Sequence, residues 1–155
     1  MTDIYADGCL KLCVEINQNR IGEKNIGKLS AAERRLVASR IAECTIFANK
    51  YAVRTDVVSG DVPPEDISIA DLAMGVESGE SKNIEITEEV LKETLSTGLF
   101  TSKGANRMGW AHQTYAEYLA SFYIQQGRLS FKQLKRLIVH PSDSSEHIVP
   151  QLADK

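Results

Sequence analysis

His112 is the side chain in this sequence whose type and position best suit the binding of an anion. It directly follows a short β-capable run and begins a densely apolar segment, residues 110–123 (WAHQTYAEYLASFY). At the first turn of a helix the macrodipole favours a neutral imidazole, which can donate one hydrogen bond to a phosphate. The alternative is a histidine that only makes local hydrogen bonds, because partial burial is ordinary for this residue type.

A second candidate, residues 22–29 (GEKNIGKL), nearly matches a phosphate-binding loop. That motif needs Ser or Thr at the position of Leu29, because the hydroxyl holds a magnesium ion, and it needs a strand before the loop. Here an amphipathic helical pattern precedes the glycines, and the next helix start is Ser30. We therefore interpret the segment as a loop and expect the chain alone to bind no ATP.

The other reactive side chains do not form a catalytic or metal-binding pattern. The sequence contains neither a Gly-x-Ser-x-Gly elbow nor a His-Glu-x-x-His helix. Cys9 and Cys13 are one pair at helical spacing, but Cys44 and the histidines supply no second pair for a zinc site. Glu117 lies in an apolar helical segment, where it is either hydrogen-bonded or at the helix margin. We expect buried, reduced cysteines, no metal and no catalytic residues.

Composition and length are those of a globular protein in water. Of 155 residues, 43% are hydrophobic and 25% are charged, which is enough for a buried core. No apolar run approaches the roughly 20 residues that span a bilayer, and the N-terminus lacks the regions of a signal peptide. We expect a cytoplasmic protein that does not bind a membrane.

Acidic residues are concentrated in the middle of the chain. Residues 56–93 hold eleven Asp and Glu against Lys82 and Lys92, although the formal net charge of the whole chain is only −3. Such a stretch is usually a solvated face, and it lacks the Lys and Arg that contacts to nucleic acid phosphates require. We therefore expect no nucleic acid partner.

Capping residues and apolar spacing predict the helices that precede His112. Ser30 and Glu33 form a capping box, and Thr87 followed by two glutamates is a good N-cap. Residues 54–67 and 75–83, which are rich in Gly, Pro, Ser or acids, are predicted to be connections. The predicted helices cover residues 3–19, 31–51, 68–74 and 87–96.

A β-hairpin and further helices follow. Residues 99–102 and 107–111 flank a turn with Gly and Asn, which is typical of a hairpin. The helix at 112–126 is apolar over most of its circumference and must be buried. Another helix starts at the capping box of Ser130, and one more is expected at 146–153.

Three helices and then a hairpin are the order of a winged helix, with the hairpin as its wing. The sequence therefore predicts a mainly α fold. We expect a winged-helix domain over residues 1–126, and the start of a C-terminal helical, HEAT-like repeat region over 127–155.

The segment at 110–123 resembles the aromatic-x-His-x-Thr-aromatic-x-Glu-aromatic-Leu-Ala segment that closes the winged-helix domain of NACHT-type ATPases. These are STAND-class signalling NTPases related to NOD-like receptors. Residues 84–100 and 40–51, with the opening stretch around Ile4, resemble the earlier helices of that domain, so the likeness covers about residues 1–126. Trp110 stands where the family usually has Phe, and Ala116 where it often has Gln.

The resemblance implies a regulatory role. In that family the histidine reaches the bound nucleotide, so His112 is the implied nucleotide-sensing residue. The implied partner is an upstream, intramolecular nucleotide-binding domain that holds ADP or ATP with Mg in a P-loop ATPase parent. This chain would hold the ADP-bound closed state and relay activation, with an oligomer forming on activation, as in bacterial antiviral defence, and would not itself be an enzyme.

Two alternatives remain open. A DNA-binding winged helix, a transcription regulator, would carry a basic helix before its wing, whereas residues 87–96 hold three Glu and one Lys. A helical protein-interaction module would use the basic helix that follows Ser130.

Overall fold

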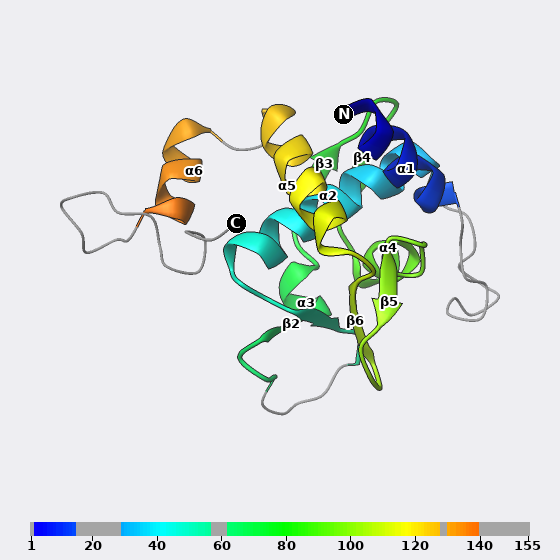
Figure 1. Cartoon of the computed structure of the whole chain (residues 1–155), viewed down its shortest axis with the longest axis vertical. Coiled ribbons are helices and arrows are strands. Elements are labelled where there is room, and N and C mark those ends of the chain that lie inside the picture. The colour runs from blue at the N-terminus through cyan, green and yellow to red at the C-terminus, as the bar shows by residue number, and fades with distance from the viewer. Residues whose placement is uncertain (1, 15–28, 57–61, 128–129, 140–155) are drawn as a thin grey trace.

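The computed structural model describes residues 2–14, 29–56, 62–127 and 130–139 (Figure 1). This part is a small mixed α/β protein in which more residues are helical than extended, so the predicted mainly α class is confirmed only in part. The elements are α1 (Thr2–Val14), α2 (Ala31–Phe47), β1 (Ala52–Arg54), β2 (Asp66–Ser68), α3 (Ile69–Leu72), β3 (Val76–Ser78), β4 (Asn83–Glu85), α4 (Glu88–Leu95), β5 (Phe100–Ser102), β6 (Arg107–Trp110), α5 (Gln113–Gln125) and α6 (Phe131–Ile138).

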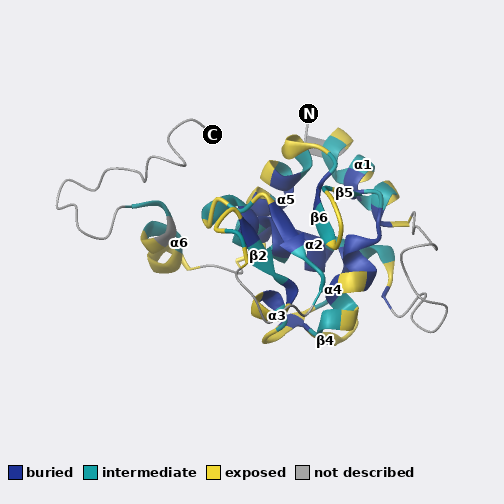
Figure 2. Ribbon diagram, turned by 90° about the horizontal axis from the view of Figure 1, so that it is seen from below, coloured by how far each residue is buried: buried dark blue, intermediate teal, exposed yellow. Residues whose placement is uncertain are grey.

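Helix α2 is the centre of the molecule. Helices α1, α4 and α5 all pack against it, and its Val37, Ala38, Ile41 and Ala42 are fully buried. One face of α5, which includes Leu119, is buried and packs against α2, whereas Glu117 and Ser121 on its other face are exposed, so the prediction of a buried helix is confirmed for one face only. Figure 2 shows α5 with both buried and exposed positions. Burial of apolar surface stabilises a fold by about 25 cal/mol per Å², so the packing around α2 contributes to stability.

Local capping signals predict most helix starts correctly. The capping box of Ser30 and Glu33 forms as predicted, and the side chains of Ser68, Thr87 and Ser130 each accept a bond at their N-cap. Helix α2 ends at Phe47, not at residue 51, because the chain turns through Asn49 in a left-handed conformation (φ 51°). Residues 15–28 and 140–155, where the end of the first helix and a last helix are predicted, lie outside the described residues.

A four-stranded sheet has the order β2-β1-β6-β5. The predicted hairpin is confirmed as β5 and β6, with Phe100 opposite Trp110 and Ser102 opposite Met108. The prediction that residues 54–67 are only a connection is wrong at both ends, because Arg54 belongs to β1 and Asp66 begins β2. Strand β1 pairs antiparallel to β6, and β2 pairs parallel to β1. Strands of three residues are too short to show an alternating pattern, and their partners are distant in sequence.

A second hairpin occupies the stretch 75–83, which the sequence predicts to be a loop. Strands β3 and β4 pair antiparallel, with Glu77 opposite Ile84. Both of these central residues are buried, while their neighbours along each strand are exposed. The burial of Glu77 requires a distant partner, and the local sequence gives no sign of one.

Candidate functional site

A pocket of about 470 Å³ opens at the start of α5. Its walls come from the end of α2, the turn that leads to β1, the residue before β2, the β5–β6 hairpin and the start of α5. The lining includes His112 and two lysines, together with one acid and one tyrosine: Lys50, Tyr51, Glu65, Lys103 and His112. A volume of several hundred Å³ is typical of small-molecule sites.

His112 is the N-cap residue of α5, and its backbone is extended, with φ −137° and ψ 138°. Its side chain is exposed and makes no capping hydrogen bond, while its ring meets Tyr115 edge-on at 5.5 Å between centroids. The first backbone N–H groups of a helix have no intrahelical acceptor. The imidazole and the start of α5 therefore present hydrogen-bond donors at the same wall of the pocket.

Trp110 fixes the position of His112 relative to α2. Its indole Nε1 donates to Thr45 Oγ1 at 3.1 Å, and its ring packs on Phe100 with centroids 4.3 Å apart. The next residue, Ala111, donates its N–H to the carbonyl of Leu99 at 2.9 Å. A Phe at this position, as in the family that the segment resembles, would lack the hydrogen bond to α2, so the tryptophan adds an anchor.

Two lysines give the pocket its positive charge. Lys50 Nζ donates to the carbonyl of Pro64 at 2.7 Å, and Lys103 Nζ lies 5.4 Å from the centre of the Tyr51 ring. The one carboxylate in the lining is that of Glu65. Sequence reasoning missed Lys50 and Lys103 as partners of His112, since they lie in two turns far apart in the chain and belong to no motif.

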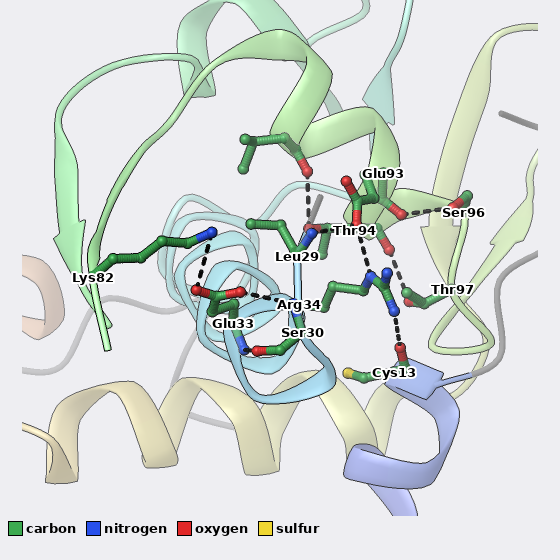
Figure 3. A network of polar contacts seen from close by, with 11 residues as sticks. Cys13, Leu29, Ser30, Glu33, Arg34, Lys82, Glu93, Thr94, Ser96 and Thr97 are labelled. Atoms are coloured by element: carbon green, nitrogen blue, oxygen red, sulfur yellow. Dashed lines mark hydrogen bonds and ion pairs between the residues drawn. The ribbon is translucent and has the colours of Figure 1, made fainter. Parts of the chain in front are cut away.

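Leu29, the last residue of the phosphate-loop-like segment, belongs to a buried polar network. Residues 22–28 lie outside the described residues, but Leu29 is buried and its N–H donates to Glu93 Oε1 at 3.0 Å (Figure 3). The same carboxylate oxygen accepts from Arg34 Nε at 2.9 Å, and Arg34 Nη1 donates to the carbonyl of Cys13 at 3.0 Å. The network thus joins α1, α2 and α4.

Two of the three cysteines are buried as predicted, and the third is half-buried. Cys9 and Cys13 are inaccessible and Cys44 is half-buried, and all three are free thiols. Across the described ranges, no three His, Cys, Asp or Glu side chains gather as a metal site would require. Glu117 is exposed on α5, so of its two predicted environments the helix margin is the one observed.

A second buried polar cluster holds the β3–β4 hairpin. Glu77 Oε1 accepts from Arg40 Nη1 at 2.6 Å and from the hydroxyl of Tyr123 at 2.7 Å. Burial, reinforced by this bond to Glu77, raises the pKa of Tyr123 well above its usual range. The cluster ties the hairpin to α2 and α5 and lies apart from the His112 pocket.

Comparisons with protein-family models, with curated proteins and with solved structures find no significant match. None of the described helices combines the length and the apolar character needed to cross a bilayer. The geometry itself defines a small α/β protein with a basic pocket at the start of α5.

Proposed function

We propose that this chain is a winged-helix regulatory module of a NACHT-type nucleotide switch. Helices α2, α3 and α4 precede the β5–β6 hairpin, which is the order expected of a winged helix with β5–β6 as the wing. The pairing of β1 beside β6 extends the wing into a sheet, which supports this assignment. The chain is in this proposal a regulatory part of a cytoplasmic ATPase and not an enzyme by itself.

The single observation that carries the proposal is the environment of His112. An exposed imidazole without a capping bond stands at the N-terminus of α5 and lines the pocket together with Lys50 and Lys103. A hydrogen-bond donor, two ammonium groups and a helix N-terminus are the groups that bind phosphate. We assign to His112 a hydrogen bond to a phosphate of ADP held, with its Mg, by an upstream nucleotide-binding domain.

The bond would act through a shift in populations. Because His112 contacts the nucleotide only in the closed arrangement, its bond stabilises that state alone. Release of ADP removes the contact and favours opening, which would expose surfaces for oligomer formation and, in bacterial defence, for signalling. The ligand therefore acts on the equilibrium by its differential affinity for the two states.

The test is His112→Ala in a parent protein that includes the nucleotide-binding domain. Loss of one bond to a charged group is worth about 1.5 to 3 kcal/mol, so ADP release should quicken by roughly one to two powers of ten. Resting activity should rise by the same factor. Stopped-flow release of a fluorescent ADP analogue measures this change.

The matched control is Gln125→Ala, an exposed residue at the other end of α5, which should leave ADP release unchanged. The fold of both variants is checked by circular dichroism. Unchanged ADP release and resting activity in a folded His112→Ala protein would reduce His112 to a locally bonded histidine and remove the basis of the proposal.

A further inference from the structure

We propose that Lys103 is a second phosphate-binding residue of this pocket, and that Gly109 and Tyr51 hold its ammonium group there. The inference rests on the proposed function, because it names a further contact of the same site. The ligand class is the phosphate chain of a nucleotide, which pyrophosphate represents in the simplest form. The group that binds is the ammonium of a lysine in the turn of the β5–β6 hairpin, directly after Ser102.

Lys103 does not extend into solvent as a turn lysine usually does. Its backbone N–H donates to the carbonyl of Arg107 at 2.9 Å, and its side chain then folds back across Gly109 on the neighbouring strand. A Cβ at position 109 would lie 2.8 Å from Cγ and 2.9 Å from Cε of Lys103, and 3.0 Å from the carbonyl oxygen of Tyr51. The absence of a side chain at Gly109 therefore leaves the space in which Lys103 lies.

The ring of Tyr51 supports the other end of the side chain. The ammonium is 5.4 Å from the ring centre, which is within the range of a cation–π contact. A lysine ammonium has three N–H donors, so those that do not point at the ring stay available to an anion. Lys50 differs, since one of its donors already bonds to the carbonyl of Pro64.

The charges of the pocket favour one anionic group. Lys50 and Lys103 face the single carboxylate of Glu65 in the lining, so the pocket has an excess of positive charge before His112 is counted. Lys103 lies on the hairpin and His112 at the start of α5. A phosphate bound by both would therefore be contacted by two different elements. An anion bound between them would fix the hairpin relative to α5.

The experiment titrates the 155-residue chain with pyrophosphate and follows backbone and imidazole signals by NMR. We expect shifts at Lys103, His112 and Gln113. Lys103→Met should weaken pyrophosphate binding about tenfold, the loss of one charge-assisted contact. Lys11→Met, which removes an exposed lysine on α1, should change the affinity less than about twofold.

Gly109→Ala tests whether the open space at Gly109 positions the side chain of Lys103. It should weaken binding when Lys103 is present, and it should have no further effect in the Lys103→Met background, because both changes act through the same ammonium group. The amide spectrum of each variant verifies that it is folded. An effect of Gly109→Ala that persists without Lys103 would overturn the positioning role.

The outcomes separate this inference from the proposed function. Absence of pyrophosphate binding by the wild-type chain, or an affinity that Lys103→Met leaves unchanged, would overturn the role of Lys103. If pyrophosphate binding requires Lys103 but the His112→Ala parent releases ADP at an unchanged rate, the phosphate-binding role of Lys103 is supported. The proposed role of His112 in a nucleotide switch is then overturned.

Discussion

At the scale of single residues, burial decides the chemistry of the three thiols. Burial raises the pKa of Cys9 to about 11, and raises that of Cys13 to about 12. Burial together with the neighbouring carboxylate of Glu43 raises the pKa of Cys44 to about 12. The thiolate is the nucleophilic form of cysteine, so these side chains are inert at neutral pH and serve as small apolar residues.

We predict that a disulfide reagent such as DTNB does not label the native chain at pH 8. A raised folded-state pKa keeps the thiol protonated until the pH approaches 11, so labelling should rise only in strongly alkaline buffer or on unfolding. In guanidinium chloride all three cysteines should react. Rapid modification of any one cysteine in the folded protein would contradict the burial described here.

At the scale of elements, a buried ion pair connects helices that are far apart in sequence. Glu93 of α4 and Arg34 of α2 have side chains only 3% and 7% exposed, and they meet at 2.9 Å (Figure 3). Removal of one partner leaves the other charge buried without compensation, which is far more destabilising than loss of a surface pair. The orientation of α4 against α2 therefore depends on both side chains.

We predict that Glu93→Ala lowers the free energy of unfolding by about 3 to 5 kcal/mol. The matched control lies on the same helix, where Glu88 pairs with the exposed Lys92 at 3.1 Å. Glu88→Ala should lower the free energy of unfolding by only about 0.5 kcal/mol. Urea denaturation followed by circular dichroism measures both, and equal losses would show that the Arg34 pair does not stabilise the fold.

At the scale of the whole molecule, the distribution of charge bears on the DNA-binding alternative. Because Glu93 is buried, the surface of α4 is less acidic than its sequence indicates. Its other two acids, Glu88 and Glu89, still outnumber its single lysine, Lys92. On the hairpin, Arg107 forms two bonds to Asp66, at 2.7 and 2.8 Å. Lys103 in the hairpin turn is then the main unpaired cation that α4 and the hairpin would offer to a DNA groove, which is little positive charge for phosphate contacts.

We predict that the chain does not shift a DNA duplex in a gel at physiological salt. A variant with Glu88→Lys and Glu89→Lys supplies the control, since added cations should produce weak binding that falls steeply with salt. Binding by the unaltered chain with a steep salt dependence would instead place a transcription regulator first among the functions.

The sequence alone determined those features whose causes are local. Ser30 with Glu33, and Thr87 before α4, could be identified because a cap acts on N–H groups within the next few residues. The hairpin around Gly104 follows from turn residues between two short runs. His112 at the start of α5 follows in the same way from the change from strand to helix.

Only the tertiary structure decided the features that join distant segments. Strands β1 and β2 have three residues each, so their pairing is set by distant partners and not by a pattern along the chain. Glu77 and Glu93 look like surface acids in sequence, yet Arg40 and Arg34 make their burial tolerable. The pocket of His112 likewise exists only because the fold brings two separate turns to the start of α5.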